Sequence, residues 1–262
     1  MWTGLAVVLA GGLALRLWGV RQGLPFAYNA DEADHFVAHA IEMFQKGTLN
    51  PEYFANPPAY TYVLHFLFAV WYGGAAGAVH AFAVRPEAVY TLARVLAALL
   101  GTAALWLLYA TGARLFNRAV GLLAAAIEAV AFLPVFYAHL ALNDAPTLAP
   151  ATLSLLGSAG VLRKGRRRDY LSAGIGLGLA CATKYTAGIV IVPLAVAIAA
   201  RYLDVRARRD RGSPCFLPLF LRHLSGKLLI LKTCLQFNVA GRSRTVVSCK
   251  PDAHFSVGVG ET

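Results

Sequence analysis

Charged residues are scarce in this chain. They make up 14% of its 262 residues, whereas hydrophobic residues make up 58%. A soluble domain carries about 25% charged residues and needs far fewer apolar side chains to fill its core. This composition excludes an ordinary soluble globular protein and indicates a chain that crosses a membrane several times.

Acidic residues are the rarer charged class, with 13 Asp and Glu against 24 Lys and Arg, which gives a formal charge of +11. Such an excess can attract nucleic acid, but here most of the cations lie in short runs between apolar stretches. The positive-inside bias of membrane proteins produces this distribution. We therefore expect membrane lipids, and no nucleic acid, among the partners.

Cysteine is limited to four residues, and no two of them form a CxxC pair. Cys181 lies in an apolar stretch, and Cys215, Cys234 and Cys249 are widely spaced. This pattern excludes a disulfide framework and a cysteine-based zinc site.

Long apolar runs are abundant and predict an all-α, polytopic integral membrane protein. A helix needs roughly 20 residues to cross a bilayer. The first run could instead be a signal peptide, but no basic segment precedes it and similar runs recur downstream. About six transmembrane helices are expected, from residues 2–20, 88–111, 119–140 and 146–162 and from two arms within 171–200.

Basic loops predict the direction of these helices. Arginine-rich runs at 163–168 and 201–211, with a weaker run at 113–118, are typical of cytoplasmic loops. Two crossings must then separate each run from the next. The block 171–200 is therefore expected to turn back on itself near Lys184.

The same reasoning predicts which segments reach the outer face. The tip LNDAP at 142–146 and the turn at Lys184 would both lie there. Residues 57–83 would lie along that face or re-enter it as juxtamembrane helices, because a Pro-Pro step begins them and a Gly-Gly step interrupts them. Asp31 would lie on the same face.

Residues 31–44 are expected to form one short amphipathic helix at the membrane interface. This helix could simply bury its phenylalanine side in lipid and expose its acidic residues to water. Alternatively, Asp31 could act as a general base toward an acceptor hydroxyl. Asp31, His35 and His39 could also hold a divalent metal, although no further ligand is evident and no cofactor is required. The apolar stripe contains Phe36, Ala40 and Phe44, and the polar stripe contains Asp31, His35, His39 and Glu42.

Further charged residues lie at or within the predicted spans. Asp144 precedes Pro146 in a pattern typical of a helix start. An acid at a membrane boundary, however, also indicates water, a partner or a ligand beside it. Lys184 and Arg94 either extend to lipid headgroups or bind a lipid phosphate. Glu128 should face another helix, and the sequence does not identify its partner.

Five segments occur in the order found in one known superfamily. They are DEADHFVAHAIEM from Asp31, NPPAYTYVL from Asn56, Arg94 in its span, LNDAP from Leu142, and GLGLACATKYTAG ending at 188. With these segments the chain resembles the phospholipid-carrier-dependent glycosyltransferases, which include protein O-mannosyltransferases and aminoarabinose transferases and have the C-type glycosyltransferase fold.

The resemblance implies a function and a role for each matched residue. It implies an enzyme that moves a sugar from a polyprenyl-phosphate donor to a hydroxyl of a protein, lipid or glycan on the outer face of the plasma or inner membrane. Asp31 would be the general base, Glu32 would contact substrate, and Asp144 would line the same cavity. Lys184 and Arg94 would bind the carrier phosphate. His139 stands where some relatives have an arginine, so phosphate binding is expected to differ there.

The resemblance covers residues 1–211, which we interpret as a transmembrane catalytic module. Residues 212–262 contain three of the four cysteines and no long apolar run. We interpret this tail as a shifted reading frame, with a disordered segment or a genuine short variant as alternatives. Two other readings of the chain stay open: a membrane transport or binding protein, and an inactive truncated glycosyltransferase.

Overall fold

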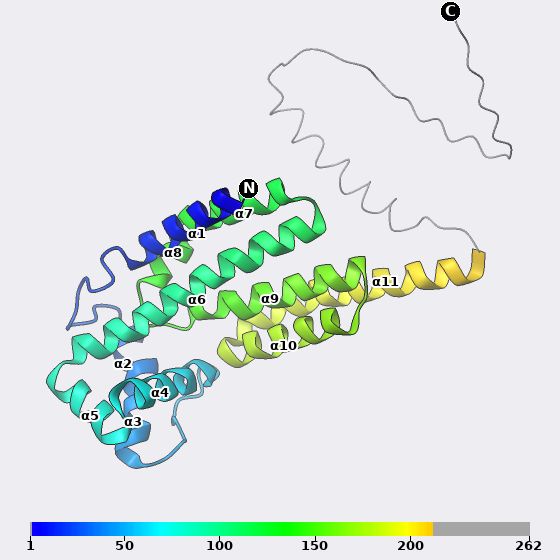
Figure 1. The fold of residues 1–262 in the computed structure, drawn as a ribbon. Helices are drawn as coiled ribbons and strands as arrows, with labels where there is room; N and C mark the ends of the chain where they lie inside the picture. The colour runs from blue at the N-terminus through cyan, green and yellow to red at the C-terminus, as the bar shows by residue number, and fades with distance from the viewer. Residues whose placement is uncertain (1, 212–262) are drawn as a thin grey trace, which may run out of the picture. The chain divides into compact units, whose positions relative to one another are not determined.

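The computed structural model describes residues 2–211, with side chains through residue 207. The tail 212–262 and its expected change of reading frame lie outside the described residues. Helices are the only regular secondary structure among the described residues, which confirms the all-α prediction (Figure 1). Its elements are α1 Trp2–Leu17, α2 Ala30–Asp34, α3 Phe36–Lys46, α4 Ala59–Tyr72, α5 Ala75–Val84, α6 Pro86–Leu115, α7 Arg118–Val130, α8 Phe132–Ala138, α9 Asp144–Arg163, α10 Arg167–Thr183, the 3-10 helix η1 Tyr185–Val190, and α11 Ile191–Arg211.

The number of membrane crossings is smaller by length and composition than the six expected. Helices α6 and α9, and the stretch Tyr185–Ala207, are long and apolar enough to cross a bilayer. Two bent pairs, α4 with α5 and α7 with α8, raise the number to five if each pair is one span. Helix α1 is apolar but has only 16 residues, and α10 has 17. The structure therefore supports a polytopic membrane fold without confirming six spans.

Helices α9 and α10 form a tight hairpin because glycines remove side chains from their interface. A Cβ on Gly157 would lie 2.3 Å from the backbone nitrogen of Ala173, and a Cβ on Gly176 would lie 2.4 Å from that of Ser154. Small residues allow helix backbones to approach closely within a membrane. The turn between the helices contains Gly165 with φ of +59°, a conformation that favours glycine.

The break expected near Lys184 is present. Helix α10 ends at Thr183, and Lys184 is extended, with φ −151° and ψ 124°. Helix α11 then packs against α9. A Cβ on Gly165 would lie 3.0 Å from Nε of Arg201, so α11 returns to the α9–α10 turn. The block 171–200 thus reverses direction, as the spacing of the basic runs predicts.

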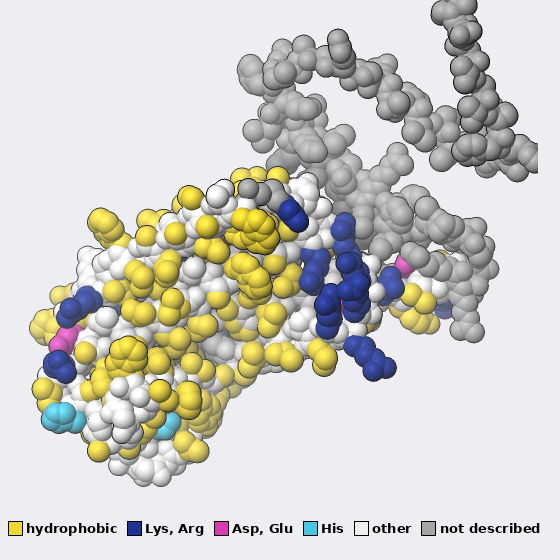
Figure 2. All heavy atoms as spheres, in the orientation of Figure 1, with side chains coloured by type: hydrophobic (Ala, Val, Ile, Leu, Met, Phe, Trp, Pro, Cys, Tyr) yellow, Lys and Arg dark blue, Asp and Glu magenta, His cyan; other side chains and the backbone are white. Residues whose placement is uncertain are grey.

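The basic segments meet at one end of the helices. Nη1 of Arg114, in the last turn of α6, donates to Oδ1 of Asp169 in the first turn of α10 at 3.3 Å. Figure 2 shows Lys and Arg side chains gathered at this end, where α9 ends and α10 begins in Figure 1. Asp144 and Lys184 lie at the other ends of the same two helices. Helix α9 has 20 residues, or about 30 Å of length, which is the thickness of a bilayer core.

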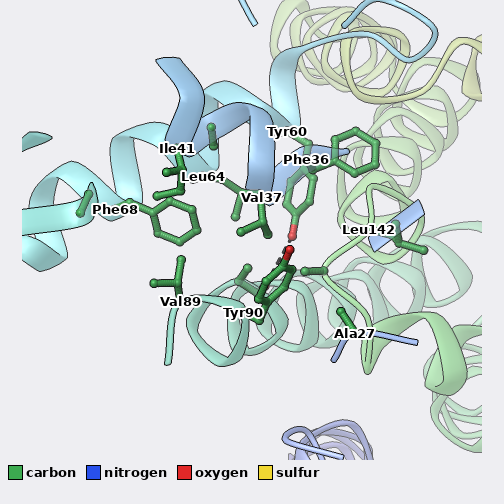
Figure 3. Packing of buried hydrophobic residues seen from close by; sticks show 14 residues of the cluster. Ala27, Phe36, Val37, Ile41, Tyr60, Leu64, Phe68, Val89, Tyr90 and Leu142 are labelled. Carbon is green, nitrogen blue, oxygen red and sulfur yellow. Dashed lines mark hydrogen bonds between the residues drawn. The ribbon is translucent and has the colours of Figure 1, made fainter. Parts of the chain in front are cut away.

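The segment from Pro57 to the end of α5 is broken, as expected. Helices α4 and α5 meet at 92°, where Gly73 and Gly74 have φ of +73° and +112°. Together with α3 and the start of α6 they enclose an apolar core, in which Val37, Leu64 and Phe68 are fully buried (Figure 3). This core holds the loop-rich half of the molecule against the long helix α6.

The expected single helix at 31–44 is instead two helices. Helix α2 ends at Asp34 and α3 begins at Phe36, with His35 between them at φ −105° and ψ −97°. The phenylalanine side does not face lipid either, because Phe36 is 2% exposed and packs in the core just described. The break allows α2 to point Glu32 toward α6 while α3 keeps its apolar side on α4 and α5.

An arginine that marks the end of an apolar run in the sequence is buried in the structure. Arg16 donates from Nη1 to the carbonyl oxygens of Gly12 at 3.0 Å and Ala129 at 3.2 Å, and from Nη2 to that of Glu128 at 3.4 Å. It therefore joins α1 to α7. Arg16 is therefore the cation that lies near Glu128, the acid whose partner the sequence does not identify.

Candidate functional site

Asp144 and Lys184 form an ion pair at the non-basic end of the α9–α10 hairpin. Asp144 is the first residue of α9, and Lys184 directly follows α10. The Lys184 Nζ donates to Oδ1 of Asp144. Their side chains are 28% and 31% exposed, so the pair is largely desolvated but still accessible from one side. The structure brings these two predicted residues into direct contact.

Asn143 fixes the backbone around this pair. It is 2% exposed, and its Nδ2 donates to the carbonyl oxygen of Thr183 at 2.7 Å and to Oδ1 of Asn56 at 3.4 Å. The hydroxyl of Tyr185 donates to the carbonyl oxygen of Phe54 at 3.4 Å. The segment before the Pro-Pro step therefore lies directly beside the Asp144–Lys184 pair.

The same segment connects the pair to Asp31. Nδ2 of Asn56 donates to the hydroxyl oxygen of Tyr53 at 2.9 Å, and the Tyr53 ring stacks with His35 at 4.5 Å between centroids. Nδ1 of His35 lies 3.6 Å from Oδ1 of Asp31. The Asp31 side chain is 70% exposed, so a substrate can reach it. We call this connected set the polar site: Asp31, His35, Tyr53, Asn56, Asn143, Asp144 and Lys184.

Tyr53 and Asn56 were not singled out from the sequence as site residues. Tyr53 lies in an irregular loop, where no periodicity assigns its direction. Asn56 precedes Pro57, and a residue before proline favours an extended backbone. This preference is the only sequence signal that the Asn56 side chain could project from the loop. Their stacking and hydrogen bonds connect the two acids that the sequence separates by more than a hundred residues.

The metal alternative finds no support in the arrangement of these side chains. His35 and His39 both stack on the ring of Tyr53, at 4.5 Å and 5.1 Å between centroids. Across residues 2–207, no group of three His, Cys, Asp or Glu side chains could hold a metal ion. Asp31, His35 and His39 therefore do not form the three-ligand face that their spacing suggests.

Glu32 and Arg94 have a different place from the one expected for substrate-binding residues. Glu32 is fully buried and Arg94 is 3% exposed. Nε and Nη2 of Arg94 donate to the two carboxylate oxygens of Glu32 at 2.6 Å and 2.7 Å. The Glu32 carboxylate also accepts from the backbone nitrogen of Ala141 at 2.7 Å. This bidentate pair connects α2 to α6 and to the loop before α9. It thereby fixes the position of α2, the helix that carries Asp31.

Arg94 and His139 nevertheless share a cavity of about 360 Å³. Tyr28 and Gln22 contribute polar groups to its lining. Nη1 of Arg94 is already engaged with the carbonyl oxygen of Gln22 at 2.9 Å, and Nε2 of His139 lies 2.9 Å from the carbonyl oxygen of Leu15. Both side chains are thus held by protein groups, and the cavity is separate from the Asp144–Lys184 pair.

An apolar groove of about 310 Å³ opens beside the Asp144–Lys184 pair. Pro146 and Thr183, which lie next to the pair in sequence, form one part of its wall. The other lining residues come from α4, α6, α9 and α10, and include Tyr60, Val63, Leu100, Leu107, Leu153 and Leu179. The Lys184 ammonium, which is 31% exposed, thus belongs to the residue that follows Thr183 of the groove wall, an arrangement that suits an amphiphile with an anionic head.

A family model described as dolichyl-phosphate-mannose-protein mannosyltransferase matches residues 56–209. The chain belongs to this family. The matched range contains Asn56, Arg94, Asp144 and Lys184, but it begins after Asp31. No curated protein matches the chain, and no solved structure matches it.

Membership in the mannosyltransferase family agrees with the helical membrane fold and makes the chain a membrane glycosyltransferase. It confirms the resemblance to this superfamily, and the matched range contains four of the five sequence segments. The roles of individual residues stay predictions, which the geometry of the polar site supports to different degrees.

Proposed function

We propose that this protein transfers a sugar from a polyprenyl-phosphate donor to a hydroxyl group of a protein, lipid or glycan acceptor. The observation that carries the proposal is the Asp144–Lys184 pair, whose sequence neighbours Pro146 and Thr183 line the apolar groove. An ammonium group beside a hydrophobic groove matches the two ends of such a sugar donor, a phosphate and a long hydrocarbon chain. Family membership supports the same class of reaction.

Lys184 binds the phosphate of the sugar donor in this proposal. When the bond between the anomeric carbon and the phosphate oxygen breaks, its electrons go to the phosphate, and the negative charge there increases. A lysine held in place by Asp144 and by the frame of Asn143 stabilises that charge without reorganising. The prenyl chain lies in the groove between α4, α6, α9 and α10.

Asp31 acts as the general base. The acceptor hydroxyl attacks the anomeric carbon on the side opposite the phosphate, and Asp31 takes the hydroxyl proton as the new bond forms. Exposure of its carboxylate and contact with His35 suit this role. The buried Glu32–Arg94 pair positions Asp31 and does not contact substrate.

The proposed site faces the outside of the plasma or inner membrane. Support comes from the basic end of the α9–α10 hairpin, which lies about one bilayer thickness from the Asp144–Lys184 pair. Lysine and arginine accumulate on the cytoplasmic side of membrane proteins. The polar site would then lie on the extracytoplasmic side.

Transfer of radiolabelled sugar from a polyprenyl-phosphate donor, by membranes that contain the full chain, tests the proposal. Asp31→Asn should lower the transfer rate by about 10²- to 10⁴-fold, the usual contribution of a general base. Asp34→Asn is the matched control, because Asp34 is exposed on the same short helix. Equal transfer by wild type and Asp31→Asn would remove Asp31 from the role of base. A wild-type chain that transfers no sugar from any polyprenyl-phosphate donor would refute the proposed reaction.

A further inference from the structure

A second cavity lies at the basic end of the helices, remote from the polar site. It has a volume of about 190 Å³ and lies among the last turns of α6 and α9 and the first turn of α10. Arg114, Arg163, Lys164 and Arg168 line it, and Asp169 is the single carboxylate of its lining. Cations around so small a space repel one another, and a shared anion would relieve that repulsion.

The carboxylate does not neutralise most of this charge. Asp169 is buried, and its Oδ1 accepts from Nη1 of Arg114 while its Oδ2 accepts from the backbone nitrogen of Arg166 at 3.2 Å. In residues 2–207, no acidic side chain pairs with the other three cations of the lining. The cavity therefore carries an excess of positive charge that the described protein groups leave uncompensated.

A glycine allows the ion pair in the wall of the cavity to form. A Cβ on Gly160 would lie 2.3 Å from Oδ1 of Asp169 and 2.8 Å from Nη1 of Arg114. No side chain fits there without separating this ion pair. Gly160 thus makes room for the Asp169–Arg114 pair, which forms one wall of the cavity. Arg163, Lys164 and Arg168, which also line the cavity, are exposed and can reach an anion from the membrane surface.

Exposed apolar residues continue from the cavity along α10. Helical spacing places Leu171 and Ile175 on the same side of α10 as Arg168. They are 63% and 56% exposed. An acyl chain can pack along these two side chains while a headgroup occupies the cavity, whereas a free anion would gain nothing from them.

We propose that this cavity binds the phosphate of an anionic phospholipid headgroup, on the membrane face opposite the polar site. The phosphate oxygens accept hydrogen bonds from Arg163, Lys164 and Arg168, and an acyl chain lies along Leu171 and Ile175. Bound lipid connects the ends of α6, α9 and α10. This inference does not depend on the identity of the sugar donor.

Binding of phosphatidylglycerol to the purified full chain in neutral detergent, measured by native mass spectrometry, tests the site. Phosphatidylcholine serves as the zwitterionic comparison. Arg168→Gln should weaken phosphatidylglycerol binding by roughly fivefold to tenfold, the loss expected for one charge-assisted contact. Arg167→Gln is the matched control, because Arg167 carries the same charge on the adjacent exposed position but does not line the cavity. It should change binding by less than about twofold.

A second variant tests the shape of the cavity without changing its charge. Gly160→Ala should weaken phosphatidylglycerol binding. The melting temperature of this variant shows whether its fold persists. If the Gly160→Ala variant unfolds, the comparison of Arg168→Gln with Arg167→Gln alone tests the proposal. Equal weakening by Arg167→Gln and Arg168→Gln, or equal binding of phosphatidylglycerol and phosphatidylcholine, would overturn the proposal. Displacement of the lipid by an equal concentration of inorganic phosphate would assign the cavity to small anions and overturn it as well.

Discussion

Replacing Glu32 by glutamine should strongly destabilise the protein, because it removes one partner of a buried ion pair. The Glu32 side chain is fully buried, and its oxygens accept hydrogen bonds from Nε and Nη2 of Arg94 and from the nitrogen of Ala141. Glutamine has nearly the same size, so packing is preserved. Its amide nitrogen, however, must face a donor of Arg94 or Ala141, and the guanidinium becomes a buried charge without a counter-charge.

The expected cost is about 3–5 kcal/mol, the usual penalty for removing one partner of a buried ion pair. The free energy of unfolding of the purified protein, measured by titration with sodium dodecyl sulfate in mixed micelles, provides the assay. Glu52→Gln is the control, because Glu52 pairs with Lys46 at 2.6 Å on the exposed surface, and it should change nothing measurable. Sugar transfer should fall in Glu32→Gln together with the fraction of folded protein.

A double variant separates an unpaired charge from lost packing. Glu32→Gln combined with Arg94→Met removes both charges and should recover part of the stability. Recovery is incomplete because Arg94 also donates to the carbonyl oxygens of Val20 and Gln22, which the double variant leaves without this donor. Equal stability of Glu32→Gln and wild type would refute the view that this pair holds α2 in place.

Two further changes test the frame of the site. Gly157→Ala should cost about 1–3 kcal/mol of unfolding free energy, because the added carbon meets the backbone of Ala173, whereas Gly174→Ala, which meets nothing within 4 Å, should cost nothing. A loss of stability in both variants, or in neither, would contradict the described packing of α9 on α10. Asn143→Ala should cost about 1–3 kcal/mol, since it leaves the buried carbonyl oxygen of Thr183 without a partner. Unchanged melting of this variant would show that Asn143 does not frame the Asp144–Lys184 pair.

The placement of Asp144 and Lys184 at the same end of the α9–α10 hairpin could be predicted from the sequence because it depends on topology alone, whereas their ion pair could not. Basic runs before and after the block 171–200 require the chain to reverse between them, and this reversal brings the end of α10 to the start of α9. The Gly-Gly break after α4 could also be predicted, because glycine tolerates the positive φ that the 92° bend requires.

Other features could not be read from the sequence because distant partners determine them. The apolar periodicity of residues 31–44 continues without interruption through His35, yet the helix breaks there while Glu32 pairs with an arginine 62 residues away. Arg16 is satisfied mainly by backbone carbonyl oxygens of α7, which leave no sequence signal. Tyr53 lies in a loop, and only its contacts with Asn56 and His35 assign it to the site.

The affinity for the sugar donor in Lys184→Gln tests the central claim most directly. If the donor phosphate binds at the mouth of the apolar groove, the KM for a polyprenyl-phosphate sugar should rise at least about tenfold, or about 1.4 kcal/mol. Lys46→Gln, which removes an exposed lysine of α3, should leave the KM within about twofold of wild type. An unchanged KM in Lys184→Gln, with sugar transfer otherwise intact, would contradict the account.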